Sequence, residues 1–86
     1  MSAVLTLPRD ARLPAIGDLF AHLEGITVVD ASETEWCDTS TLSLLLACAR
    51  QARRQGKTLT LLAPPPQLRR LAQLHGVEDL LFAGSP

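Results

Sequence analysis

The sequence predicts an α/β protein with a mainly parallel central sheet and helices packed on it. Short, partly β-branched apolar segments alternate with segments of helical periodicity, in the order strand, helix, strand, helix, strand, helix. This alternation is typical of parallel strands joined by right-handed crossovers. Hydrophobic residues make up 47% of the chain, which supports a packed core and argues against disorder. A chain of 86 residues is expected to form one domain.

Residues 3–7 (AVLTL) predict a first strand that Pro8 ends. It is expected at or near a sheet edge, because proline cannot donate a ladder hydrogen bond. A helix should follow, with Pro14 in its first turn and Gly25 just past its end. Its buried face is predicted by apolar residues at the spacing i, i+3, i+4, i+7, namely Ile16, Leu19, Phe20 and Leu23.

Residues 26–31 predict a second strand whose continuous apolar centre suggests burial on both faces. The longest helix is expected over residues 40–55, with Gly56 in the left-handed cap position. Residues 57–62 predict the third strand. Beyond it, three prolines lead into a helix from Pro66 to Gly76, and residues 77–82 form a last element of unassigned type.

Charge and cysteine content exclude several function classes. The net charge is −1 and the pI about 6.0, so no basic excess favours nucleic acid. No apolar run approaches the roughly 20 residues of a membrane span, and no signal peptide precedes the first strand. Cys37 and Cys48 have neither CxxC spacing nor a nearby histidine, so neither a metal nor a cofactor is expected. These features predict a cytoplasmic protein.

The segment EWCDTSTLSLLL, residues 35–46, gathers Asp38 and four hydroxyl side chains just before an apolar run. Asp38 is a suitable N-cap for the long helix. Capping accounts for this aspartate and one hydroxyl, but does not need four. A helix N-terminus also favours a phosphate or an incoming anion. Two interpretations therefore remain open: a cap alone, or a site where a partner, an anion or a phosphate is bound.

A helical wheel of the long helix separates two faces. The face toward the sheet is predicted to carry Leu42, Leu45, Leu46 and Ala49. The opposite face is expected to carry Ser40, Leu44, Ala47, Gln51 and Arg54, which would form a contact surface with few charges. On this wheel Ser40 should be more accessible than Thr39.

Catalysis is not expected. A nucleophilic serine needs a base, and His22 and His75 lie far from the cluster in the sequence. Neither a GxGxxG nor a GxxxxGK[ST] motif is present. Binding of a small ligand or anion at Asp38–Thr41 remains an alternative of a different class.

The run ITVVDASETEWCDTSTLSLLL, residues 26–46, resembles the core of the STAS domain family. There, a strand ending in Asp leads through a loop to a D-[ST]-[SGA]-[GA]-L motif that opens a helix. The later run ARQARRQGKTLTLLAPPPQLRRLAQLHGVEDLL resembles the remainder of that domain. The resemblance implies that residues 1–86 form a single STAS domain, with a shortened N-terminal strand region.

Two branches of that family suggest functions for the cluster. In anti-sigma-factor antagonists a kinase phosphorylates the serine that matches Ser40, which breaks binding to the kinase-like partner. In the STAS subunit of the phospholipid-trafficking Mla ABC transporter, a threonine that matches Thr39 matters, and the domain docks on the cytosolic ATPase subunit. The Asp-Thr start and the leucine run look closer to this second branch and to similar stand-alone proteins.

The resemblance therefore implies a bacterial regulatory or adaptor protein without catalytic activity, at the inner membrane if its partner is a transporter. The partner would be an anti-sigma factor, a Ser-kinase-like protein or an ABC-transporter ATPase, and a homodimer is a further option. The expected partner-binding residues are Trp36, Asp38, Thr39, Ser40, Thr41, Leu44, Ala47 and Gln51. Relative to the motif, Cys37 should point into the core. Trp36 should point into the loop as an exposed anchor, or else fold back over the sheet edge.

Overall fold

The computed structural model describes residues 3–82. A three-stranded sheet has the order β1-β2-β3, and both neighbouring pairs are parallel. The α/β class and the edge position of the first strand are confirmed. Along the chain the elements are β1 (Ala3–Thr6), the 3-10 helix η1 (Gly17–Ala21), β2 (Ile26–Asp30), α1 (Thr39–Arg54), β3 (Thr60–Leu62), α2 (Pro66–Leu74) and α3 (Glu78–Phe82).

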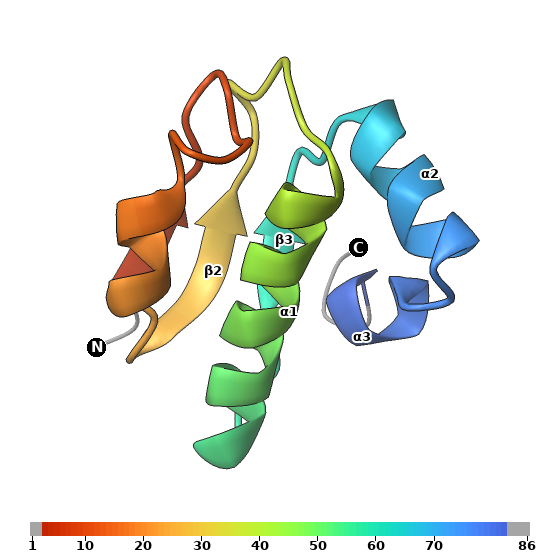
Figure 1. Cartoon of the computed structure of the whole chain (residues 1–86). Coiled ribbons are helices and arrows are strands. Elements are labelled where there is room, and N and C mark those ends of the chain that lie inside the picture. The colour runs from red at the N-terminus through yellow and green to blue at the C-terminus, as the bar shows by residue number, and fades with distance from the viewer. Residues whose placement is uncertain (1–2, 83–86) are drawn as a thin grey trace.

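The helices lie on one face of the sheet (Figure 1). Val29 of the central strand aligns with Leu61 of β3, and both side chains are buried under the helices. The side chains that alternate with these along the strands point to the other face of the sheet. There, Val4 is 58% exposed and Leu62 is 41% exposed. Among residues 3–82 no helix covers this second face. The expected burial on both faces holds only at the start of β2, where Ile26 and Thr27 are both buried, whereas Val28 and Asp30 are half-buried.

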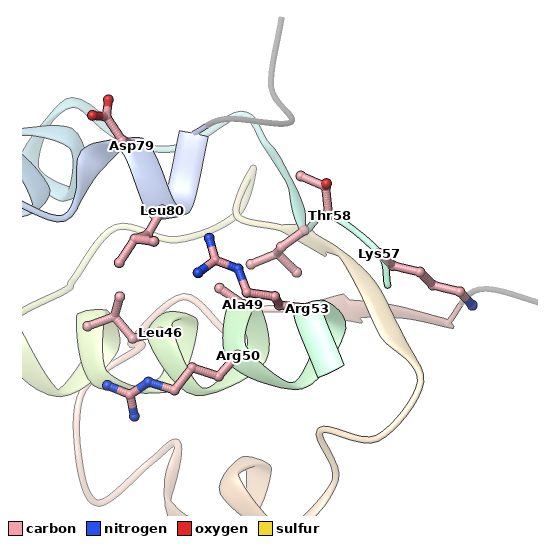
Figure 2. Close-up of a pocket in the computed structure, with 9 residues that line it drawn as sticks. Leu46, Ala49, Arg50, Arg53, Lys57, Thr58, Asp79 and Leu80 are labelled. Atoms are coloured by element: carbon pink, nitrogen blue, oxygen red, sulfur yellow. The ribbon is translucent and has the colours of Figure 1, made fainter. Parts of the chain in front are cut away.

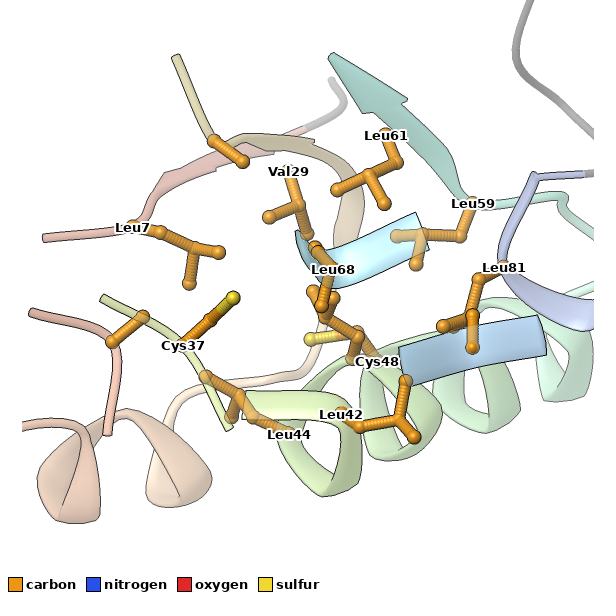
Figure 3. Packing of buried hydrophobic residues seen from close by; sticks show 14 of the residues in the cluster. Leu7, Val29, Cys37, Leu42, Leu44, Cys48, Leu59, Leu61, Leu68 and Leu81 are labelled. Atoms are coloured by element: carbon orange, nitrogen blue, oxygen red, sulfur yellow. The ribbon is translucent and has the colours of Figure 1, made fainter. Parts of the chain in front are cut away.

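The core lies between the sheet and the helices (Figure 3). Leu7, Leu61, Leu68 and Leu81 come from different segments of the chain and are almost completely buried. The long helix α1 contacts β2, η1, α2 and α3, so it is the element on which the other helices pack. Burying several leucines in this way is the main stabilising term, at about 1.5–3 kcal/mol for each side chain.

The buried face of α1 agrees with the predicted one only in part: Leu42 and Leu45 are buried as predicted, whereas Leu46 and Ala49 are half-buried. Its buried strip runs through Thr41, Leu45, Cys48 and Ala52, which is rotated by roughly a fifth of a turn from the predicted strip at ~100° per residue. Leu44 is wholly buried, so its predicted outward position is wrong. The reason is that α1 packs against η1 as well as against the sheet.

Two other predicted elements are shorter than expected. The first helix is a five-residue 3-10 helix, Gly17–Ala21, rather than an α-helix from Pro14 to Gly25. Its backbone bonds run from Leu19 N to Ile16 O and from His22 N to Leu19 O, each three residues back. The third strand begins at Thr60 instead of residue 57, because the Lys57 N–H donates to Ala52 O of α1 at 2.9 Å.

The remaining boundaries agree closely with the prediction. The long helix ends at Arg54 and is followed by Gly56 at φ 71°, the left-handed conformation expected of a cap. The helix after the prolines begins at Pro66. The segment of unassigned type forms α3, whose Leu81 is buried in the core.

Candidate functional site

The start of α1 is closed by a reciprocal pair of hydrogen bonds. Asp38 is the N-cap, and its Oδ1 accepts from the Ser40 N–H at 2.8 Å. In return, the Asp38 N–H donates to Thr41 Oγ1 at 3.1 Å. This capping box satisfies backbone groups that the first turn would otherwise leave unpaired. A hydrogen bond from the Ser40 hydroxyl, followed by backbone bonds, lowers the pKa of the Asp38 carboxyl.

Thr41 belongs to the interior and not to a partner surface. Its side chain is completely buried, and its hydroxyl donates to the carbonyl oxygen of Ala11. One hydroxyl thus serves as acceptor in the capping box and as donor to a loop that precedes it by 30 residues. The prediction that Thr41 contacts a partner is therefore wrong.

The two hydroxyls before it differ in accessibility, in the reverse of the predicted order. Thr39 is exposed, whereas Ser40 is half-buried. The Ser40 Oγ accepts from the Leu13 N–H at 3.1 Å and donates to the Asp38 carboxylate. The wheel predicted an accessible Ser40, but it could not show that Leu13 of an earlier loop contacts this side chain.

The loop of residues 9–13 lies against the segment before α1. The Ala11 N–H donates to Trp36 O at 2.8 Å, and the N–H groups of Glu35 and Trp36 donate to Arg9 O at 2.8 and 3.0 Å. An ion pair joins Arg9 to Glu35. These contacts place loop 9–13 beside the cluster, although the sequence contains no pattern that pairs the two segments.

Two large apolar side chains are exposed where these segments meet. Trp36 is 55% exposed, and Leu13, whose N–H reaches Ser40, is 56% exposed. The Arg12 guanidinium lies 5.3 Å from the centroid of the Trp36 ring, and Arg12 also pairs with Asp10 at 2.8 Å. This pairing, mainly the hydrogen bond from Arg12, lowers the pKa of the Asp10 carboxyl.

The predicted orientation of the tryptophan is confirmed, because Cys37 is buried while Trp36 is exposed. Sequence reasoning missed Leu13. The sequence indicates this residue only weakly, because it is an isolated leucine before a proline and lies outside the predicted helical face. We call the group of side chains around the start of α1 the docking surface. It consists of the exposed Leu13, Trp36, Asp38 and Thr39 and the half-buried Ser40. Ala47 and Gln51 are half-buried further along α1.

Among the described residues, the Ser40 hydroxyl lies beside a carboxylate and a backbone N–H and not beside a histidine. Neither His22 nor His75, the C-caps of η1 and α2, is hydrogen-bonded to it within residues 3–82. In the same range, no three His, Cys, Asp or Glu side chains are grouped closely enough to hold a metal ion. The part of the chain that is described also contains no helix long and apolar enough to span a membrane.

Comparison with known proteins gives a family for the fold. The family model described as "Mlab, STAS domain" matches residues 2–82. A search of curated proteins found no match. The matched range includes the three parallel strands, the capped helix α1 and the loop that carries Trp36. The chain belongs to the STAS domain family.

Proposed function

We propose that this chain is a non-enzymatic regulatory or adaptor protein that docks a cytosolic protein partner through the docking surface at the start of α1. STAS domains are generally regulatory or partner-binding domains without catalytic activity. One candidate partner is a Ser-kinase-like anti-sigma factor, for which phosphorylation of Ser40 would switch the binding.

The exposure of Trp36 and Leu13 is the observation that carries the proposal. Large apolar side chains on a surface are ordinary when isolated. Here both lie on segments that hydrogen bonds hold against each other and against the capped helix end. Two large exposed apolar side chains beside hydroxyl groups provide contact area for a partner, and tryptophan is enriched among interface hot spots.

The hydrogen bonds of Ser40 supply a mechanism for the switch. Its hydroxyl now donates to Asp38. A phosphate there would bring about −1.5 to −2 charge next to that carboxylate, so attraction would become repulsion. The same oxygen accepts the Leu13 N–H, so phosphorylation would also disturb the backbone that positions Leu13. Thr39, which is exposed, would contact the partner directly.

Binding to a purified Ser-kinase-like anti-sigma factor from the same genome tests the proposal. We expect Trp36→Ala and Leu13→Ser each to weaken binding about tenfold or more, the scale of an interface hot spot. Ser40→Asp should weaken it through charge. Leu74→Ser is the matched control, because Leu74 is 75% exposed but lies on α2. Wild-type affinity in all docking-surface variants would refute the proposed surface.

A second candidate partner is the ATPase subunit of a phospholipid-trafficking ABC transporter. The description of the matching family model favours it, as does the Asp38-Thr39 start of α1. In this case Thr39→Ala should weaken co-purification with the ATPase, while Ser43→Ala should not, since Ser43 is an exposed hydroxyl one turn further along α1. Parallel pull-downs of the anti-sigma factor and the ATPase distinguish the two candidates.

A further inference from the structure

A cavity of about 230 Å³ opens at the opposite end of α1 from the docking surface. It lies between the second half of α1, the segment that leads into β3, and α3 (Figure 2). None of the docking-surface residues contributes to it. Its lining consists of Leu46, Ala49, Arg50, Arg53, Lys57, Thr58, Leu59, Asp79 and Leu80.

The cavity is open to solvent, and it combines apolar side chains with Arg53, an exposed cation that extends into it (Figure 2). Leu46 and Leu80 face each other across it, and the Arg53 guanidinium extends between Leu80 and Thr58 (Figure 2). Lys57 and Asp79 point away from the centre (Figure 2). Within residues 3–82, Arg53 has neither an ion pair nor a side-chain hydrogen bond.

Helix stability alone does not explain this arrangement. A cation in the last turn of α1 is favourable to the helix dipole, and both Arg53 and Arg54 occupy that turn. Only Arg53 also lines the cavity. Among the described residues that line the cavity, Arg50 and Lys57 at the rim outnumber the one acid, Asp79. The site therefore favours an anion above an apolar floor.

We propose that this cavity binds a small amphipathic anion, with its apolar chain between Leu46 and Leu80 and its carboxylate or phosphate on Arg53. The volume equals that of roughly eight water molecules, which suits a chain of about six to eight carbons. Arginine matches both carboxylate and phosphate geometry through paired N–H donors. Such a ligand would give the domain a second input that does not depend on its protein partner.

Titration of the isotopically labelled full chain with octanoate, followed by NMR, tests this proposal. We expect saturable shifts of the leucine methyl signals of Leu46, Leu59 and Leu80, and no comparable shifts at Leu13 or Leu74. Hexyl phosphate replaces octanoate in a second titration, and the tighter binder identifies the preferred headgroup. Acetate, which lacks the chain, and 1-octanol, which lacks the charge, should each bind at least fivefold more weakly.

Arg53→Gln should weaken octanoate binding at least fivefold, whereas Arg54→Gln, on the same helical turn but outside the cavity, should change it less than twofold. Thermal unfolding of both variants checks that the fold is intact. Equal binding of octyltrimethylammonium, equal effects of the two arginine variants, or the absence of saturable shifts would each overturn the proposal. None of these results depends on whether the docking surface binds a protein.

Discussion

The hydroxyl groups at the start of α1 have distinct roles, although the sequence presents them as one cluster. Thr41 joins the capping box to Ala11, and Ser40 joins the cap to Leu13. The Ser43 Oγ donates to Thr39 O at 3.1 Å, an ordinary bond within the helix. Within the described residues, the Thr39 side chain is exposed and has no hydrogen bond of this kind. The hydroxyls of Ser40 and Thr41 therefore form hydrogen bonds between segments of the fold, whereas the exposed Thr39 side chain is available to a partner.

Thr41→Val tests the structural role of the buried hydroxyl. It keeps the side-chain shape but leaves the Asp38 N–H and the Ala11 carbonyl without their partner. We expect a loss of about 1–3 kcal/mol in the free energy of unfolding, measured by urea denaturation. Ser43→Ala, which removes an exposed hydroxyl, should stay within about 0.5 kcal/mol. An equal loss in both variants would contradict the assignment.

The buried thiol of Cys48 predicts how the stability of the protein depends on pH. Burial raises the pKa of its thiol to about 11, so the native protein holds the neutral form at physiological pH. In the unfolded chain the thiol ionises near pH ~8.5. The contribution of the neutral Cys48 thiol to the free energy of unfolding is therefore complete below pH ~8.5 and falls as the pH rises toward 11.

The measurement is thiol modification by a disulfide reagent in the Cys37→Ala variant, which leaves Cys48 as the one thiol. Modification at pH 8 should be slow in the native protein and fast in urea. Fast modification of the native protein would show that the thiol is accessible and ionised.

Some of these residue positions could be predicted from the sequence, and others could not. The alternation between Cys37 and Trp36 follows from local register, and it is correct. The accessibility of Ser40 depends instead on Leu13, a residue 27 positions earlier. No periodicity encodes that contact, because backbone hydrogen bonds join Arg9 and Ala11 of loop 9–13 to Glu35 and Trp36.

At the scale of elements, Gly56 ends α1 in the left-handed region, at φ 71°. Among residues 3–82, no atom lies within 4 Å of a Cβ placed at Gly56, so an alanine would suffer backbone strain without a clash there. We expect Gly56→Ala to lower the free energy of unfolding by about 1–2 kcal/mol. The control is Gly17→Ala in η1, whose nearest Cβ neighbour is at an ordinary 3.9 Å. It should be neutral or slightly stabilising, and equal losses in thermal unfolding would contradict the expectation.

Element prediction succeeded where periodicity was strong and boundaries were marked. The helices α1 and α2 begin and end within about two residues of the expected positions, between an aspartate or proline and a glycine. The helical spacing of Ile16, Leu19 and Phe20 was misleading, because three residues spaced by three or four also fit one 3-10 turn. The buried face of α1 was only partly predicted, because Thr41 and Cys48 were not counted as core residues.

At the scale of the whole molecule, the sheet separates a packed face from an open one, and neighbouring leucines of β3 test this. Leu61 is 1% exposed and Leu62 41% exposed. We expect Leu61→Ala to cost about 2–5 kcal/mol, because it removes core contacts and leaves a cavity. Leu62→Ala should cost clearly less, about 1 kcal/mol at most. Chemical denaturation of the two variants checks this, and similar costs would mean that the second face is covered.

The length of α1 sets the distance over which its two ends can influence each other. Its 16 residues span about 24 Å at 1.5 Å per residue. Mobile ions screen surface charges over about 8 Å at physiological ionic strength. Ser40 and Arg53 lie about 20 Å apart along the helix axis, so a negative charge gained at Ser40 is screened over more than two screening lengths before it reaches Arg53. Binding at the proposed docking surface and binding in the proposed cavity are therefore expected to be electrostatically independent.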